Sequence, residues 1–224
     1  MFIIMYLIVF IHEAGHITMA SLFNFNIKKI NIYPFGGYTI FDESINKPFI
    51  QEFLVFFGGI LFQIISFMLV TLFLNTNSYT YSIFYSYNLT ILVFNMIPII
   101  PLDGSKILNI ILNYFFSFKN AHLITIYVSY ILLFILLFIF YNDINMVLMS
   151  VLMLFILIKE HRNHIYIFNI FLIERYLKNI DYKKNNIINS ITIKKMKKYN
   201  NNTFVKNNKY YNEREILDNR YKNK

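Results

Sequence analysis

The sequence predicts an all-α, polytopic membrane protein with about five transmembrane helices. Three observations favour this fold class. Of the 224 residues, 57% are hydrophobic and 15% are charged, whereas soluble domains carry about 25% charged residues. Residues 53–102 contain no Asp, Glu, Lys or Arg, and residues 120–158 contain only Asp143. Apolar stretches of 18 or more residues are typical of membrane spans.

The apolar segments and their breaks define the predicted spans, which cover residues 1–23, 49–74, 81–97, 122–141 and 144–158. The third span is broken by Pro98 and Pro101, because proline removes a backbone donor, and a short helix is expected to follow over residues 105–116. The first span is about 34 Å long as a helix, which is enough to cross a bilayer. Helix is preferred because backbone polar groups in lipid must be satisfied within the segment.

The positions of the basic residues predict the orientation. Sixteen of the 21 lysines and arginines follow Ile158, and the other five lie in residues 24–48 and 101–120. The connectors on the opposite side carry none. The positive-inside rule therefore places both stretches and the C-terminal tail in the cytoplasm, and the N-terminus outside. The formal charge of +9 comes mainly from this tail. We interpret it as a sign that the tail faces anionic lipid, not that the protein binds nucleic acid.

This pattern divides the chain into a transmembrane core, residues 1–158, and a basic cytoplasmic tail, residues 159–224. Beyond Arg175 the tail is rich in Asn, Lys and Tyr, so we expect it to be partly disordered, with a short helix near residues 213–217. The chain has no cysteine, which excludes disulfides and thiolate ligands. Any metal ion must be bound by nitrogen and oxygen atoms.

A polar cluster interrupts the first predicted span. The stretch IHEAGHITMA, residues 11–20, places His12, Glu13 and His16 in an otherwise apolar segment. On a helix, residues four apart point the same way. Two imidazoles at this spacing can bind Zn²⁺ and leave the intervening Glu to act on a water. An ionisable group within a span costs roughly 2.5–3.5 kcal/mol or more, so three in five residues favour a metal site over chance polar groups.

A catalytic zinc ion takes three protein ligands, so one more is needed. The acidic candidates in the membrane stretch are Glu52, Asp103 and Asp143. Glu52 is expected at the interface, and Asp143 belongs to a turn on the non-cytoplasmic side. Asp103 ends the segment NMIPIIPLD, whose prolines open the backbone. Irregular backbone at membrane depth is tolerated only where it lines a cavity, so Asp103 is the preferred third ligand.

Together, HEAGH and NMIPIIPLDG resemble the signature of the site-2 protease family (M50) of intramembrane zinc metalloproteases. That signature is H-E-x-G-H followed by N-x-x-P-x-x-P-x-D-G, and both halves match in order. The resemblance is closest to the stage IV sporulation protein FB group of endospore-forming bacteria, and it covers about residues 1–178. One departure lies at residues 58–63, where GGILFQ replaces the family's small-Gly-Pro-x-x-Asn.

The resemblance implies roles for the matched residues. It implies one Zn²⁺ per chain, with Glu13 as the catalytic base and three ligands: His12, His16 and Asp103. Asn95 matches an Asn that helps to hold the substrate or the oxyanion, although a helix-packing hydrogen bond is an equal alternative.

The resemblance further implies a short, membrane-associated β-hairpin after the first span, which dips toward the site. The residues that would bind the substrate there are Phe35, Gly36, Gly37 and Tyr38.

The resemblance also implies a function. The expected activity is zinc-dependent cleavage of a membrane-associated protein near the cytoplasmic face, in the bacterial cell membrane or the outer membrane of the forespore. The expected substrate is a sporulation sigma-factor precursor, and membrane proteins would inhibit the enzyme until a signal arrives. A membrane-bound anti-sigma factor is an alternative substrate. A zinc transporter and a non-catalytic membrane protein are alternatives from other classes.

Overall fold

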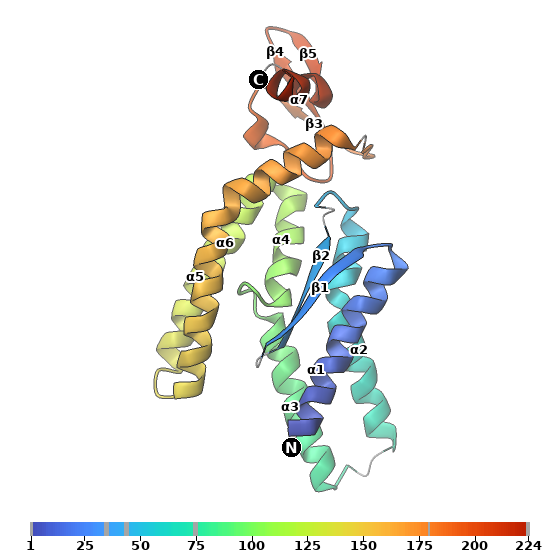
Figure 1. Ribbon diagram of the computed structural model, residues 1–224, viewed down its shortest axis with the longest axis vertical. Coiled ribbons are helices and arrows are strands. Elements are labelled where there is room, and N and C mark those ends of the chain that lie inside the picture. Colours follow the sequence, from blue (N-terminus) through green and yellow to red (C-terminus); the bar gives the residue numbers. More distant parts are fainter. Residues whose placement is uncertain (1, 34–35, 43–44, 74–75, 179, 223–224) are drawn as a thin grey trace.

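Helices dominate the architecture, and two small sheets are added to them (Figure 1). The computed structural model describes residues 2–33, 36–42, 45–73, 76–178 and 180–222. The helices are α1 (Phe2–Leu22), α2 (Phe49–Phe73), α3 (Tyr79–Met96), α4 (Asp103–Phe115), α5 (Phe118–Ile139), α6 (Ile144–Leu177) and α7 (Glu213–Tyr221). The strands are β1 (Asn26–Tyr33), β2 (Gly36–Asp42), β3 (Asn185–Ile188), β4 (Asn201–Lys206) and β5 (Lys209–Asn212).

The membrane helices agree with the predicted spans in place, and they differ in number. Among the described helices, α1, α2, α5 and α6 are long and apolar enough to cross a membrane. The third predicted span forms α3. This helix contains many Tyr, Ser, Asn and Thr side chains, so it is less apolar than the spanning stretches of the other four. The predicted all-α polytopic membrane fold is confirmed, with four helices long and apolar enough to span among the described residues where about five were expected. Helix α3 packs against α1 and α2.

Glycines bring α1 and α2 into close contact. A Cβ atom on Gly58 would lie 2.7 Å from the Gly15 carbonyl oxygen, and a Cβ on Gly15 would meet the Gly58 carbonyl. Small residues at such a crossing allow two membrane helices to approach backbone to backbone. The segment HEAGH is thereby held directly against the first half of α2.

The proline-rich segment between α3 and α4 packs against α5 and α6. Ile99 and Leu102 are buried with Ile126, Met153 and other residues of those two helices. The main-chain N–H of Ile100 donates to the Ser129 hydroxyl oxygen at 3.1 Å. This bond satisfies a backbone donor of the irregular segment, as lipid requires. The start of α4, and with it Asp103, is thereby fixed.

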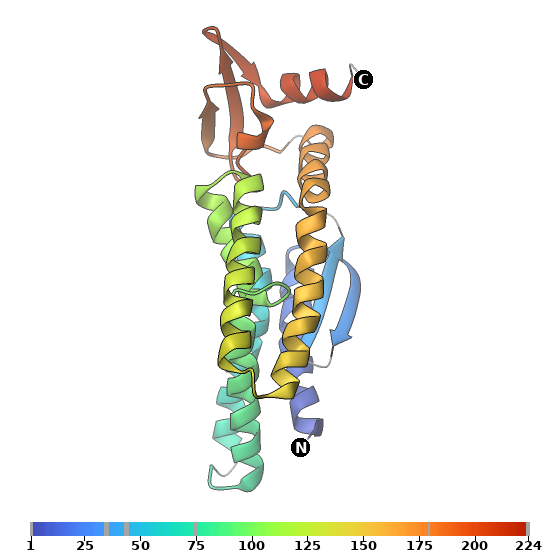
Figure 2. The ribbon, with the colours of Figure 1, turned by 90° about the vertical axis from the view of Figure 1, so that its left-hand side faces the viewer.

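The hairpin expected after the first span is present. Strands β1 and β2 pair antiparallel, with Tyr33 opposite Gly36 and Asn26 opposite Asp42. Both strands contact α1, and the hairpin lies alongside the helices (Figures 1 and 2). Gly36 and Gly37 of the predicted FGGY stretch pair with Tyr33 and Ile32, at the start of β2. Phe35 lies outside the described residues.

The C-terminal region differs from the prediction of weak order. Helix α6 continues 19 residues beyond Ile158 to Leu177, and a small folded unit follows it. Strands β3 and β4 pair parallel, β4 and β5 pair antiparallel, and α7 closes the unit with an Asn212–Glu215 capping box. We call residues 180–222 the C-terminal module. It lies at one end of the helices (Figure 2).

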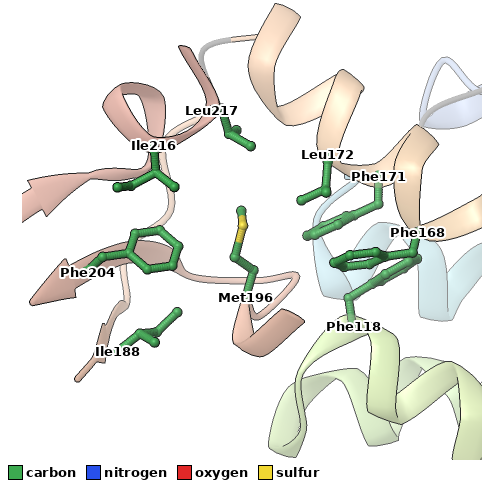
Figure 3. Close-up of a cluster of buried hydrophobic side chains, with 9 residues drawn as sticks. All are labelled: Phe118, Phe168, Phe171, Leu172, Ile188, Met196, Phe204, Ile216 and Leu217. Carbon is green, nitrogen blue, oxygen red and sulfur yellow. The ribbon is translucent and has the colours of Figure 1, made fainter. Parts of the chain in front are cut away.

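Apolar residues scattered through the polar tail explain this order. Ile188, Met196, Phe204, Ile216 and Leu217 are buried in one cluster. The cluster is completed by aromatic and aliphatic side chains from the helices, namely Phe118, Phe168, Phe171 and Leu172 (Figure 3). Since the core is shared, the module gains its apolar burial by docking on α5 and α6.

Candidate metal centre

Three side chains from two distant segments meet inside the membrane core. His12 and His16 lie one turn apart on α1, and their Nε2 atoms are 3.2 Å apart. Asp103, the first residue of α4, places its Oδ2 atom 2.9 Å from each Nε2 atom. All three side chains are buried. The two ligands predicted from one motif and the third predicted from the other are thus brought together.

The position of Asp103 is fixed on its other side. Its second oxygen, Oδ1, accepts a hydrogen bond from Lys106 Nζ at 2.9 Å. The carboxylate also sits at the N-terminus of α4, where the helix dipole favours negative charge. Asp103 therefore directs one oxygen toward the imidazoles while the other is held by a cation.

The hydrogen bonds of the two imidazoles determine which nitrogen faces inward as an acceptor. His16 Nδ1 donates to the Val55 carbonyl at 2.9 Å, and a carbonyl can only accept. His12 Nδ1 donates to Gln63 Oε1 at 3.1 Å, and Gln63 Nε2 donates to the Asn88 carbonyl at 2.8 Å. In the neutral imidazoles both protons are therefore on Nδ1, and both Nε2 lone pairs point at the Asp103 oxygen.

This donor set fits a zinc ion. The two Nε2 atoms and the Asp103 oxygen lie 2.9–3.2 Å from one another. When the imidazoles are neutral, none of these three atoms carries a hydrogen, so their lone pairs repel one another unless a cation lies between them. Ligands about 2.0–2.1 Å from a tetrahedral zinc ion are about 3.3 Å apart, close to these distances. A Cβ on Gly59 would lie 2.8 Å from His12 Nε2, so that glycine leaves the space that the imidazoles occupy.

Glu13 adjoins the same centre. It is buried, and one potential ligand atom from each of His12, Glu13 and His16 lies within 4.8 Å of the others. Asn95 is buried in the last turn of α3, eight residues before Asp103. Its role in substrate binding stays a prediction, as do the roles of the hairpin residues Gly36, Gly37 and Tyr38.

The two rejected ligand candidates have other roles. Asp143 caps α6, accepting a hydrogen bond from the Asn145 N–H at 2.9 Å. Glu52, in the first turn of α2, is buried and accepts from Lys198 Nζ at 2.7 Å and from the Tyr199 hydroxyl. Sequence reasoning found neither Lys198 nor Tyr199, because nothing local in the tail marks them as partners of α2.

Several supporting residues were also missed. Gly59, Gln63 and Lys106 all contact or flank a proposed ligand. The sequence could have indicated Gly59 and Gln63, because both lie in GGILFQ, the element that departs from the family pattern. They are four residues apart, which places them on one face of a helix.

Comparison with known proteins supports the resemblance. Residues 1–80 match the model of Peptidase family M50. Stage IV sporulation protein FB of Bacillus subtilis (strain 168) is 35% identical over 187 residues, which is 80% of this chain and 65% of that protein. Zinc metalloprotease MJ0392 of Methanocaldococcus jannaschii is 30% identical over 122 residues, or 50% of this chain and 34% of that protein. The chain thus spans less than two thirds of the length of these relatives.

A solved structure has a similar fold over much of the chain. The site-2 protease from Methanocaldococcus jannaschii superimposes with a TM-score of 0.57 and 28% sequence identity, over 71% of this chain and 76% of that chain. The similarity of fold therefore accompanies similarity of sequence.

Proposed function

We propose that this chain, whose first 80 residues match the model of Peptidase family M50, is an intramembrane zinc metalloprotease that cuts a membrane-associated protein. The convergence of His12, His16 and Asp103, with two nitrogen lone pairs facing one carboxylate oxygen, is the observation on which the proposal depends. These three residues would hold the ion. When bound, zinc supplies a Lewis acid that acidifies water and polarises a carbonyl.

The remaining chemistry belongs to the chain's own residues. Glu13 lies beside the imidazoles and acts as the base that takes a proton from the attacking water. The same carboxyl then returns a proton to the leaving amine, as a general acid. The Nδ1 hydrogen bonds to Val55 and Gln63 keep the imidazoles oriented while charge changes in the site.

The substrate must present an extended segment, because a helix shields its own carbonyls. Strand β2 of the hairpin is placed next to α1 and could pair with such a segment as an added strand. This arrangement supports the assignment of the Phe35 to Tyr38 stretch to substrate binding.

The resemblance to stage IV sporulation protein FB supports a narrower function. In this proposal the substrate is a sporulation sigma-factor precursor, cut near the cytoplasmic face of the cell or forespore membrane, with the C-terminal module in the cytoplasm and inhibitory membrane partners. The module contacts the loop before α2 through Tyr182 and the end of α4 through Lys184, and all three lie at one end of the molecule (Figure 1). This arrangement agrees with the positive-inside orientation.

The decisive experiment co-expresses the chain with membrane-tethered candidate precursors and compares wild type with Glu13→Gln. We expect cleavage by wild type and none by the variant, since an amide cannot take the proton. Zinc content measured on purified protein should be equal in both. Equal cleavage by the two proteins would exclude this mechanism, and a wild-type protein without zinc would favour a non-catalytic membrane protein. A membrane-bound anti-sigma factor belongs among the candidates.

A further inference from the structure

We propose that Gln63 is a positioning residue for the metal centre, one that fixes the proton and the orientation of His12 and ties this ligand to the backbone of α3. The inference rests on the proposed function, and it assigns a role to a residue that lies outside the HEAGH and NMIPIIPLDG motifs. Gln63 is fully buried in α2, with no exposed surface. A buried amide must find partners for both its oxygen and its nitrogen.

The first step of the argument concerns the orientation of the amide. The side-chain nitrogen of Gln63 donates to the main-chain carbonyl of Asn88 at 2.8 Å. A carbonyl oxygen can only accept, so the nitrogen of the amide must face α3 and the oxygen must face α1. The orientation is therefore determined by a backbone atom, which no side-chain substitution in α3 removes.

The second step concerns His12. The amide oxygen, directed toward α1, accepts from Nδ1 of His12 at 3.1 Å. It can do so only if Nδ1 carries a proton, which leaves the Nε2 lone pair for a metal ion. Partners of this kind are a general feature of metal-bound histidines, and their loss typically lowers metal affinity about 10–100-fold.

The two histidines differ in how they are held. His16 is oriented by the main-chain carbonyl of Val55, within the same helix that packs on α1. His12 is oriented by a side chain that bridges α2 and α3, so its position depends on three helices. Gly59 lies one turn before Gln63 and gives the imidazoles room. Gly59 therefore provides space for both imidazoles, and Gln63 orients that of His12.

The test uses the full chain in detergent and measures zinc affinity by chelator competition, with the absorption spectrum of the cobalt-substituted protein as a second readout. Gln63→Met keeps the length of the side chain but removes both hydrogen bonds. We expect zinc affinity to fall about 10–100-fold and the cobalt spectrum to shift, because His12 is free to rotate. Gln63→Glu restores an acceptor for Nδ1, and we expect it to recover most of the affinity.

Ser66→Ala is the matched control. The Ser66 hydroxyl donates to the main-chain carbonyl of Gln63 at 2.8 Å, so the variant removes one hydrogen bond from the same part of α2 without reaching His12. Its zinc affinity should equal that of wild type. The inference is overturned if Gln63→Met binds zinc as tightly as wild type, or if Gln63→Glu is as weak as Gln63→Met. A wild-type protein that binds no zinc would instead overturn the proposed function.

Discussion

Single residues determine the space and charge at the metal centre. The rings of His12 and His16 stand nearly perpendicular, at 81°, with their centroids 4.8 Å apart. This edge-to-face arrangement lets both Nε2 atoms converge on one Asp103 oxygen, and it leaves no room for a side chain on α2 beneath them. Gly59 is therefore required by the approach of the ligands.

A Gly59→Ala substitution tests this requirement. The added methyl group would lie against Nε2 of both imidazoles, so we expect the purified variant to lose most of its zinc. Overpacking of this kind costs about 1–3 kcal/mol of stability. Elemental analysis and thermal unfolding would measure the two effects. Ile65→Ala, at an exposed position of the same helix, should keep wild-type zinc content, and a fully loaded Gly59→Ala protein would contradict the packing described here.

At the scale of elements, the hairpin and α4 differ in what they contribute around α1. Strand β2 contacts α1, the helix of the imidazoles, whereas α4 delivers Asp103 from the proline-rich segment held by Ser129. The three proposed metal ligands all lie on helices. Metal binding and substrate binding should therefore be separable by changes to the hairpin.

Replacing residues 33–40 by a Gly-Ser linker of equal length tests this separation. The ladder between β1 and β2 would lose most of its second strand, so an extended substrate would lose its pairing edge. We expect cleavage to fall strongly while the zinc content stays at one ion per chain. A densitometric cleavage assay beside elemental analysis provides both readouts. Undiminished zinc-dependent cleavage would show that the hairpin does not bind the substrate.

At the scale of the whole molecule, the C-terminal module is joined to the membrane core through the start of α2. Glu52 accepts hydrogen bonds from Lys198 and Tyr199 of the module, and all three side chains are buried. Burial raises the pKa of the Tyr199 hydroxyl above its ordinary value, so it stays protonated and donates. The loop before α2 is held too, because Asn46 donates to Glu174 at 3.0 Å and accepts from Tyr182. Docking of the module therefore positions the helix that supports the metal centre.

A double-mutant cycle on Glu52 and Lys198 measures this docking. Removing one partner of a buried ion pair costs about 3–5 kcal/mol, so we expect Glu52→Gln and Lys198→Met each to loosen the module. Contacting residues couple by about 0.5–3 kcal/mol, so the double variant should be less destabilised than the two single effects added. Thermal unfolding and limited proteolysis between residues 178 and 184 would report both quantities.

The surface pair Lys222 and Asp218, 3.0 Å apart, supplies the control. Lys222→Met should give no measurable shift, because solvent screens exposed pairs. Strict additivity in the Glu52 and Lys198 cycle would mean that these side chains do not act as a pair.

By itself, the sequence determined the membrane class, the position of most helices, and the three residues that meet at the metal centre. Hydropathy is a local property of a segment, and the cost of placing His12, Glu13 and His16 in lipid marks them as functional whatever surrounds them.

Only the tertiary structure decided the rest. Gln63, Lys198 and Tyr199 have partners that lie 51, 146 and 147 positions away in the chain, and no local pattern encodes such distances. The order of the C-terminal module was likewise decided by packing, because its few apolar residues complete a core only together with Phe118 and Phe171 of the helices.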